Sequence, residues 1–336
     1  MTTYHFIRHL DARSIPIDDF PKIHLVVTSP PYPMIQMWDD IFCEMNPQIK
    51  DELKKNPIMA FELMHLELDQ VWKTIDPLLV DGGIVCINIG DATRKFDGNF
   101  QLFPSHARII KTFMEMGYLN LPSIIWKKPT NSPTKFMGSG TLPPNAYVTL
   151  EHEHILIFRK GGMRKNINIA QRKSSSFFWE ERNQWFSDIW ELTGTRQPMA
   201  EGSRTRSAAF PFEVPYRLIQ MYSIKNDWVL DPFLGTGTTT MAAIASERNS
   251  IGFELDLELV ESISKRIVSI APMLNDYIKS RLKTHEEFIR KYSEKKQPKY
   301  QNSAGFPVIT KQEIELKLNL IKSINRDNNK IVVDYL

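Results

Sequence analysis

The strongest indication of the fold comes from one stretch of the chain, Trp228-Val229-Leu230-Asp231-Pro232-Phe233-Leu234-Gly235-Thr236-Gly237-Thr238-Thr239. Its first residues favour a β-strand, and its two glycines form a turn that lets the backbone approach a ligand. A helix follows over 241–246, and an apolar step over 251–253 ends at Glu254. An acid about twenty residues beyond such a turn can hold ribose hydroxyls. The stretch therefore predicts a nucleoside-binding β-α-β unit in an α/β protein.

Two other kinds of glycine-rich site do not match this turn. A phosphate-binding P-loop requires Lys after the last glycine, whereas Thr238 follows Gly237. A dinucleotide-binding turn requires a third glycine or alanine, and Thr240 occupies that position. The turn is thus predicted to bind a nucleoside without a phosphate-specific motif.

A second motif lies near the N-terminus, where the apolar run 23–27 predicts a buried strand. The sequence Thr28-Ser29-Pro30-Pro31-Tyr32 then ends the strand, because proline donates no ladder hydrogen bond and fixes its own φ. Ser29 offers a hydroxyl, the prolines offer carbonyls on a stiff backbone, and Tyr32 offers a flat aromatic face. These groups together suit a planar amine.

The two motifs resemble those of the DNA amino-methyltransferases, whose catalytic signature is (Ser/Asp/Asn)-Pro-Pro-(Tyr/Phe/Trp). The residues 231–239 resemble the family's S-adenosylmethionine motif, and residues 28–32 precede them by about 200 positions, as in the permuted beta group. The resemblance covers roughly residues 4–270. It implies an α/β, S-adenosylmethionine-dependent methyltransferase (Rossmann-like) fold: a mostly parallel, doubly wound, circularly permuted sheet with a DNA-recognition insertion.

The resemblance also implies the residues of the site. The catalytic residues are expected to be Ser29, Pro30, Pro31 and Tyr32, while Asp91 either accepts the surplus proton or is a turn residue. The cofactor, S-adenosyl-L-methionine, is expected to contact a larger set: Asp11, Thr28, Pro211, Asp231, Pro232, Phe233, Gly235, Gly237, Thr238, Glu254 and Asp256.

The reaction so implied is methyl transfer to the exocyclic amine of a base flipped out of double-stranded DNA. Ser29 and the Pro30 carbonyl would accept the two amine N–H groups, and Tyr32 would stack on the base. Serine before Pro-Pro-Tyr is associated in the family with cytosine, so we expect cytosine N4, with adenine N6 as the alternative. The expected context is a restriction-modification system with a cognate endonuclease. A non-catalytic, cofactor-sensing DNA-binding module and methylation of RNA or protein glutamine remain further alternatives.

Periodicity and turn residues outline the rest of the chain. Strands are expected at 4–10, 84–89, 123–126 and 154–158, and helices at 104–116 and over 34–79, the latter ended by Asp81-Gly82-Gly83. A loop is expected at 127–147. The resulting division is a catalytic part over 1–158, a target-recognition insertion over 159–209, a cofactor-binding part over 210–270 and a helical extension over 271–336.

The insertion is predicted to contact DNA because it is basic, amide-rich and aromatic, although a solvated segment with packed aromatics fits the same composition. The cations expected to bind DNA are Arg159, Lys160, Arg164, Lys165, Arg172 and Lys173.

Composition excludes several classes of protein. The net charge of +3 over 336 residues is mild, so DNA must be bound by a local patch. Two cysteines, Cys43 and Cys86, argue against a disulfide scaffold and are expected in the core. His152 and His154 could converge on one face of a strand, but no further ligands are evident, so no metal is expected. No signal peptide or membrane span is apparent, and we expect a cytoplasmic monomer or homodimer.

Overall fold

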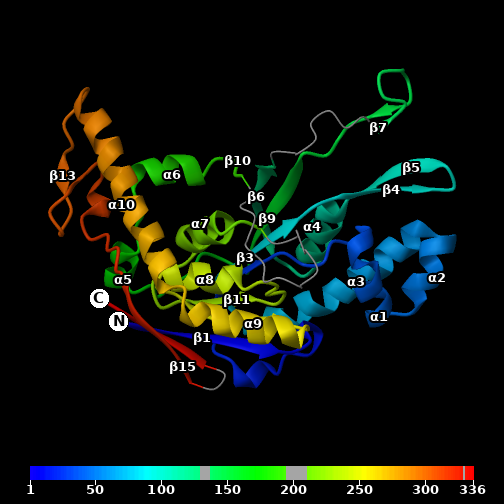
Figure 1. The fold of residues 1–336 in the computed structure, drawn as a ribbon, viewed down its shortest axis with the longest axis horizontal. Coiled ribbons are helices and arrows are strands. Elements are labelled where there is room, and N and C mark those ends of the chain that lie inside the picture. The colour runs from blue at the N-terminus through cyan, green and yellow to red at the C-terminus, as the bar shows by residue number, and fades with distance from the viewer. Residues whose placement is uncertain (129–136, 194–209, 328–329) are drawn as a thin grey trace.

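The computed structural model describes residues 1–128, 137–193, 210–327 and 330–336. Its centre is a ten-stranded sheet in the order β10-β6-β9-β3-β2-β11-β12-β1-β16-β15 (Figure 1). Three two-stranded sheets, β4-β5, β7-β8 and β13-β14, accompany it. The strands are β1 Thr2–His9, β2 Ile23–Thr28, β3 Leu79–Ile89, β4 Ala92–Phe96, β5 Asn99–Phe103, β6 Leu119–Lys127, β7 Met137–Gly138, β8 Ala146–Tyr147, β9 His152–Arg159, β10 Ile189–Glu191, β11 Trp228–Asp231, β12 Asn249–Glu254, β13 Tyr300–Gln301, β14 Pro307–Val308, β15 Ile321–Asp327 and β16 Lys330–Tyr335.

Helices cover both faces of this sheet. They are α1 Asp39–Met45, α2 Gln48–Lys55, α3 Pro57–Ile75, α4 Ser105–Glu115, α5 Ile169–Ser174, α6 Trp179–Trp185, α7 Glu213–Tyr222, α8 Thr238–Ala245, α9 Leu257–Val268 and α10 Ala271–Ser293. Alternate residues of a strand point to opposite faces. Leu25 and Val27 accordingly pack in one cluster with α7 and α8, and Val26 packs in a second with α3 and α4. The predicted doubly wound α/β fold is confirmed.

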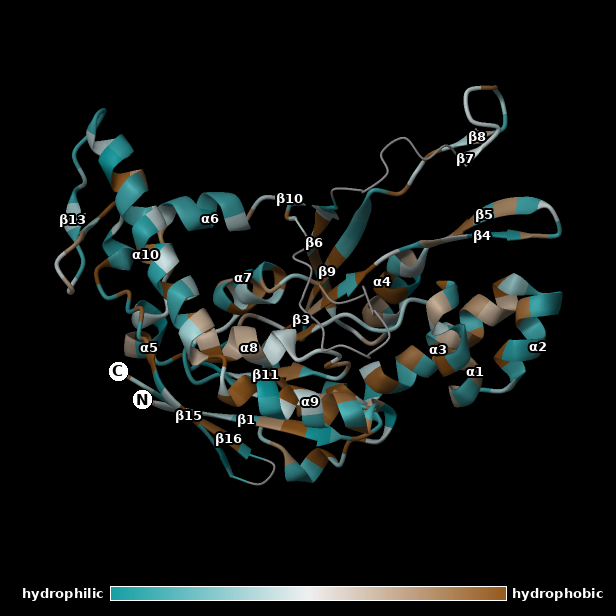
Figure 2. Ribbon diagram, viewed as in Figure 1, coloured by the Kyte–Doolittle hydropathy of each residue, from teal (hydrophilic) through white to brown (hydrophobic). Residues whose placement is uncertain are grey.

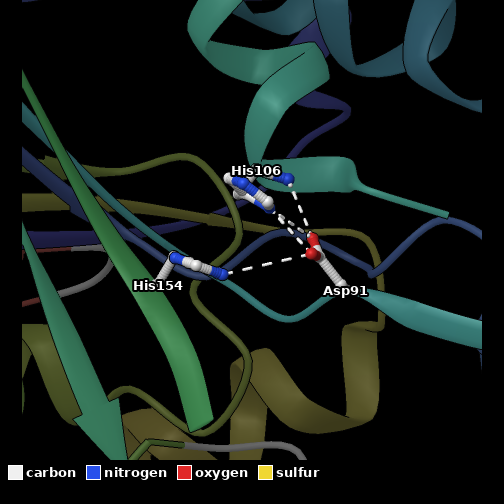
Figure 3. A group of neighbouring side chains, drawn as sticks. All are labelled: Asp91, His106 and His154. Atoms are coloured by element: carbon white, nitrogen blue, oxygen red, sulfur yellow. Dashed lines mark hydrogen bonds and ion pairs between the residues drawn. The ribbon is translucent and has the colours of Figure 1, made fainter. Parts of the chain in front are cut away.

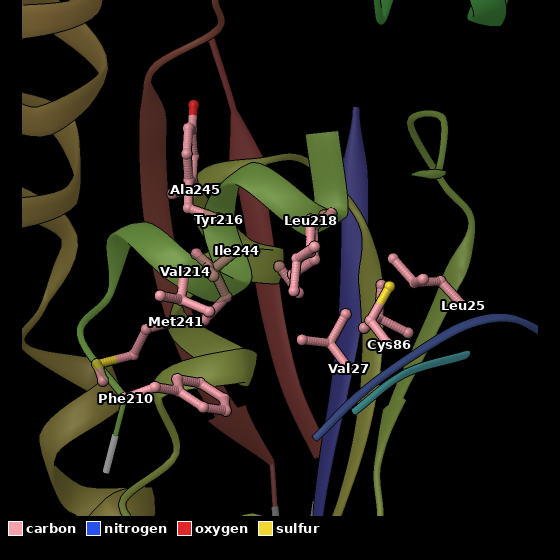
Figure 4. Packing of buried hydrophobic residues seen from close by; sticks show 14 of the residues in the cluster. Leu25, Val27, Cys86, Phe210, Val214, Tyr216, Leu218, Met241, Ile244 and Ala245 are labelled. Carbon is pink, nitrogen blue, oxygen red and sulfur yellow. The ribbon is translucent and has the colours of Figure 1, made fainter. Parts of the chain in front are cut away.

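Figure 4 draws part of the first cluster, in which Val27 of β2 and Leu218 of α7 face each other. Cys86 of β3 lies in the same cluster and is fully buried, as expected, and burial raises the pKa of its thiol. Cys43 is only partly buried. Figure 2 shows the same organisation by composition: the central strands are hydrophobic, whereas the peripheral helices α2 and α6 are largely hydrophilic.

The strands β3, β2, β11, β12 and β1 are parallel neighbours, so their carboxyl ends share one edge. We call this the carboxyl edge and the opposite side the amino edge. The chain leaves β2 toward α3 on one face and leaves β11 toward α8 on the other. Ligands of open α/β sheets bind where the winding reverses in this way, beyond the carboxyl ends of the strands. A ligand is therefore expected beyond the carboxyl ends of β2 and β11.

Several predicted elements are confirmed, and others differ from expectation. The helix before β3 ends at Ile75, and Asp81-Gly82-Gly83 lies inside β3, where Gly82 has φ +78° and donates to the Lys160 carbonyl at 2.7 Å. A glycine with positive φ can form an irregularity in a strand as readily as it ends a helix. Within the expected insertion 159–209, the chain forms α5, α6 and β10, and β10 is an edge strand of the main sheet. Residues 194–209 of this insertion lie outside the described part of the chain.

In the C-terminal segment, the α-helix ends at Ser293. The last strands, β15 and β16, join the main sheet next to β1. Within the expected loop 127–147, β7 and β8 form a short hairpin, and residues 129–136 lie outside the described part of the chain. A further hairpin, β4-β5, was not predicted and projects away from the body of the molecule (Figure 1). Among the described helices, none combines the length and the apolar character needed to cross a bilayer.

Candidate active site

The two sequence motifs meet through one hydrogen bond at the carboxyl edge. The strands β2 and β11 are parallel neighbours, with Leu25 opposite Val229. At their ends, the Thr28 hydroxyl donates to Asp231 Oδ1 at 2.6 Å. Residues 203 positions apart in the chain are thereby fixed side by side, and Ser29 begins the segment that follows.

Asp231 is a buried acceptor that holds the start of the glycine turn. Its carboxylate also accepts from the Thr239 hydroxyl at 2.6 Å and from the Phe233 backbone N–H at 3.1 Å. Burial raises the pKa of Asp231 to about 6, against the opposing effect of these hydrogen bonds. Its neighbours Pro232 and Phe233 are buried and partly buried, and the Phe233 ring lies 5.9 Å from Trp72. Asp231 is therefore the structural link between turn and strand.

The glycine turn and Glu254 form a second unit. The Gly235 N–H donates to Glu254 Oε2 at 2.8 Å, and the Asp256 N–H donates to Oε1 at 3.0 Å. Gly237 has φ +80°, and a Cβ there would lie 2.5 Å from Ile263 of α9, so only glycine fits. Asp256 caps α9 by accepting from Glu258 and Leu259. The acid at the end of β12 thus lies directly on the turn, as a ribose-binding acid requires.

Other residues expected at the cofactor lie around this unit. Asp11 lies just after β1. The N–H of the preceding residue, Leu10, donates to the Glu254 carbonyl at 3.2 Å, so Asp11 lies near the end of β12. Burial would raise the pKa of Asp11, but hydrogen bonds and charge from Arg13 outweigh it and lower that pKa. Pro211 is buried just before α7 and accepts from the Val214 N–H at 3.0 Å. Thr238, the first residue of α8, lies 3.2 Å from the Thr236 hydroxyl.

Ser29 and Tyr32 of the predicted catalytic motif belong to a hydrogen-bond network that the sequence did not predict. The Tyr32 hydroxyl donates to Glu153 Oε2 at 2.8 Å, and the Ser29 hydroxyl lies 3.1 Å from the Tyr32 oxygen. Asn88, at the end of β3 and 2% exposed, donates to both Tyr32 at 2.8 Å and Glu153 at 2.6 Å. Lys128 closes the network by pairing with the other Glu153 oxygen. Alternation along β3 and β9 predicted only that Asn88 and Glu153 are strand residues.

This network sets the direction of the Ser29 hydroxyl. Burial, followed by the charge of Glu153, raises the pKa of Tyr32 well above its ordinary value, so its hydroxyl stays protonated. Because that single proton is donated to Glu153, the Ser29 proton is the one directed to the Tyr32 oxygen. The Ser29 oxygen also accepts a long hydrogen bond from Asn88 Nδ2 at 3.5 Å, which leaves one lone pair available for a further donor. Pro30 is buried and Pro31 partly buried, which stiffens the backbone that carries this group.

Asp91 follows β3 but does not join this network. Its carboxylate accepts from the His106 backbone N–H at 3.1 Å and lies 2.7 Å from His106 Nδ1 (Figure 3). His154 Nε2 lies 4.0 Å from the same carboxylate, and the two imidazole rings stack with centroids 4.0 Å apart. Burial, followed by repulsion from His106, lowers the pKa of His154 to about 4, so this imidazole is neutral at pH 7. His106 was missed because nothing in its local sequence marks it.

The six cations expected to contact DNA are at the other side of the sheet. Arg164 pairs with Asp227, which precedes β11, with Nη2 and Oδ1 2.7 Å apart. Lys160 donates to the Asp76 carbonyl at 2.6 Å, just before β3. Arg159 lies opposite Ile84 in β3, and Lys165 follows Arg164. Arg172 and Lys173 belong to α5, whose end binds Lys225 of the same edge through Ser175. These residues lie toward the amino edge, away from Ser29, because β9 runs antiparallel to β3.

The carboxyl edge therefore combines an oriented hydroxyl acceptor, an aromatic ring and a glycine turn with a carboxylate. The ring of Tyr32 lies against Gly90, where a Cβ would approach its Cε2 to 2.9 Å. An acceptor and a flat ring suit a planar amine, and the turn with its acid suits a nucleoside. The two parts are joined by Thr28 and Asp231, so an amine and a nucleoside-borne group could be brought face to face.

Comparisons with known proteins agree with this geometry. Residues 23–266 match a family model described as DNA methylase, of the N6/N4 methyltransferase type. The chain is 51% identical over 315 residues to the Type II methyltransferase M.MthZI of Methanothermobacter thermautotrophicus, covering 92% of this chain and 88% of that protein. It is also 51% identical over 280 residues to M.MjaI of Methanocaldococcus jannaschii, covering 80% and 92%.

A solved structure from Thermus thermophilus, described as a DNA modification methylase complexed with S-adenosyl-L-methionine, is 32% identical. It superposes with a TM-score of 0.61 over 78% of this chain and 94% of that chain. Family, relatives and fold agree with the two motifs, and the chain belongs to the N6/N4 DNA methylase family.

Proposed function

We propose that this DNA methyltransferase modifies the N4 amine of cytosine within a specific short sequence, using S-adenosyl-L-methionine. The observation that carries the proposal is the 2.6 Å hydrogen bond between Thr28 and Asp231. It holds the strand that ends in Ser-Pro-Pro-Tyr against the strand that begins the glycine turn. The chain order of the two motifs supports assignment to the permuted beta group.

The residues of the turn fit S-adenosyl-L-methionine. A Cβ on Gly235 would meet nothing nearer than the Phe233 carbonyl at 3.9 Å, so the backbone is open to a ligand there. Glu254 would hold the ribose hydroxyls, and Asp11 would contact the adenine end. When bound, the cofactor supplies an electrophilic methyl group on a sulfonium sulfur. The remaining proposed contacts are Thr28, Pro211, Asp231, Pro232, Phe233, Gly237, Thr238 and Asp256.

Ser29 would act on the nucleophile. An exocyclic amine of a base is a weak nucleophile because its lone pair is delocalised into the ring. Acceptance of its two N–H groups by Ser29 and the Pro30 carbonyl localises the lone pair on nitrogen. The rate advantage then comes from orientation and electrostatic placement, and no covalent enzyme intermediate is needed. Tyr32 would stack on the flipped base, a contact worth about 1–3 kcal/mol.

Identification of the modified nucleoside tests this proposal. Plasmid DNA from cells that express the chain would be digested to nucleosides and analysed by mass spectrometry. N4-methylcytosine supports the proposal, whereas N6-methyladenine establishes the alternative target. A known DNA methyltransferase, expressed in parallel, is the positive control. If its product is detected but neither modified nucleoside is found with this chain, a non-catalytic, cofactor-sensing module is favoured. Ser29, in place of aspartate before Pro-Pro-Tyr, is the reason that cytosine is preferred.

A substitution of Glu153 tests the orientation of the hydroxyl. In Glu153→Ala, the acceptor of the Tyr32 proton is lost, so this proton turns toward Ser29 and occupies a lone pair of its oxygen. We expect the methylation rate constant to fall by about tenfold, with cofactor affinity unchanged, because one hydrogen bond of about 1.5 kcal/mol is lost in the transition state. Single-turnover methylation and calorimetry measure the two quantities. Glu151→Ala is the matched control, and equal rates for both variants would contradict the assignment.

DNA is expected to approach the carboxyl edge, where the flipped base must reach Ser29. The exposed Lys95 lies on the β4-β5 hairpin, whose Phe100 stacks on Tyr147 with centroids 4.4 Å apart. Lys95→Glu should lower the slope of log affinity against log salt by about 0.9 per lost phosphate contact. Lys173→Glu makes the same charge change at the amino edge and should leave the slope unaltered. Fluorescence anisotropy with a labelled duplex decides between them, and the reverse pattern would move the DNA surface to the amino edge.

A further inference from the structure

Three potential metal ligands converge outside the network of Ser29. They are Asp91 after β3, His106 at the start of α4, and His154 on β9. One ligand atom from each lies within 4.8 Å of the others, and the described residues contain no second such group (Figure 3). No motif in the sequence indicated that His106 or His154 would lie close to Asp91.

The distances suit a shared ion better than a closed hydrogen-bond network. Asp91 and His106 are 2.7 Å apart, a hydrogen-bond distance, but His154 Nε2 is 4.0 Å from Asp91 Oδ2, which is too long for one. No hydrogen bond of the His154 ring is found in the described part of the chain. Metal–ligand bonds of about 2.0–2.2 Å put two donors on one ion roughly 3.0–3.6 Å apart. Shifts of less than 1 Å would bring the two Asp91 pairs to that separation. The two imidazole rings are stacked with an angle of 18° between their planes, so one ring must also rotate to point its nitrogen at the same ion.

The three ligands surround the neck of the β4-β5 hairpin. Asp91 immediately precedes β4, and His106 follows the end of β5 by three residues. His154 belongs to β9, which pairs with β3 in the main sheet, with His154 opposite Ile89. An ion held by all three would close the base of the hairpin and tie it to the sheet. The preceding residue of β9 is Glu153, so the same ion would also restrain the Tyr32 network.

We propose that Asp91, His106 and His154 bind one divalent transition-metal ion at the neck of the β4-β5 hairpin. Two imidazole nitrogens and one carboxylate oxygen form a donor set that suits Zn²⁺ and its neighbours in the first transition series. Three protein ligands leave at least one position for water. The ion anchors the hairpin and takes no part in methyl transfer.

Metal binding by the full chain, purified without a histidine tag, tests the proposal independently of methylation. Equilibrium dialysis against Zn²⁺ is expected to give one ion per chain. His106→Ala, His154→Ala and Asp91→Asn should each abolish this binding, and His9→Ala, an exposed histidine at the same edge, should retain it. Circular dichroism confirms that each variant is folded.

A second measurement needs no variant. Pulsed electron paramagnetic resonance of the Cu²⁺-loaded wild-type chain counts coordinated imidazoles, and two are expected. The proposal is overturned if the wild-type chain binds no Zn²⁺, if folded His106→Ala and His154→Ala chains still bind it, or if Cu²⁺ has fewer than two imidazole ligands. Because these readouts involve neither DNA nor S-adenosyl-L-methionine, they can fail while the methyltransferase assignment stands.

Discussion

Ser29→Ala is expected to lower the rate of methyl transfer by about 100- to 1,000-fold, the effect typical of removing one preorganised hydrogen-bonding group at a reacting centre. Its hydroxyl is one end of the Ser29-Tyr32-Glu153 chain of hydrogen bonds and is partly buried. Alanine removes the acceptor without touching Thr28, which holds β2 to Asp231. Cofactor affinity should therefore be preserved while turnover is lost.

The measurement compares single-turnover methylation with calorimetric binding of S-adenosyl-L-methionine. A 2-aminopurine base at the target position reports base extrusion separately, and extrusion should persist in Ser29→Ala because Tyr32 is intact. Ser280→Ala, which alters an exposed serine of α10, is the matched control. A wild-type rate in Ser29→Ala would refute the proposed acceptance of the target amine by Ser29, and the Pro-Pro turn would then only end the strand.

Glu254→Ala is expected to weaken S-adenosyl-L-methionine binding by about 10- to 100-fold. Hydrogen bonds to a charged carboxylate contribute about 1.5–3 kcal/mol, and tenfold in affinity corresponds to about 1.4 kcal/mol. The substitution also removes the acceptor of the Gly235 N–H at 2.8 Å, which loosens the turn itself. Calorimetry on the folded chain measures the affinity.

Glu258→Ala is the control for Glu254→Ala, because Glu258 is a nearby glutamate that is exposed on α9. It should bind the cofactor like the wild type. The rate of methylation at saturating cofactor should be nearly normal in Glu254→Ala, in contrast to Ser29→Ala. Unchanged affinity in Glu254→Ala, with an intact circular dichroism spectrum, would remove Glu254 from the cofactor site.

The sequence located the fold because its strongest signals are local. Strand, glycine turn, helix and acid follow one another within residues 228–254, and each is specified by its own backbone requirements: Gly237 needs φ +80° and cannot carry a Cβ against Ile263. The same holds for the Pro-Pro turn after β2. By contrast, the β4-β5 hairpin was missed although Asp97 and Gly98, both with positive φ, form the two-residue turn that favours a hairpin. The strands β15 and β16 were taken for part of a helical extension.

The position of the basic residues 159–173 could not be predicted from local sequence patterns. Composition marked residues 159–173 as basic, but basic composition carries no information about which edge of a sheet a segment occupies. Because β9 runs antiparallel to β3, the chain returns to the amino edge at Arg159, and Arg164 pairs there with Asp227. These cations therefore lie away from Ser29, and their contact with DNA stays a prediction.

The sequence by itself determined the family, the α/β fold and the two motifs, since each depends on residues that are neighbours along the chain. Only the tertiary structure decided what surrounds Ser29 and Asp91. Asn88 and Glu153 reach Tyr32 because β3 pairs with β9, and His154 reaches Asp91 for the same reason. Long-range pairing is set by the summed packing of the sheet and its helices, and no single local pattern encodes it.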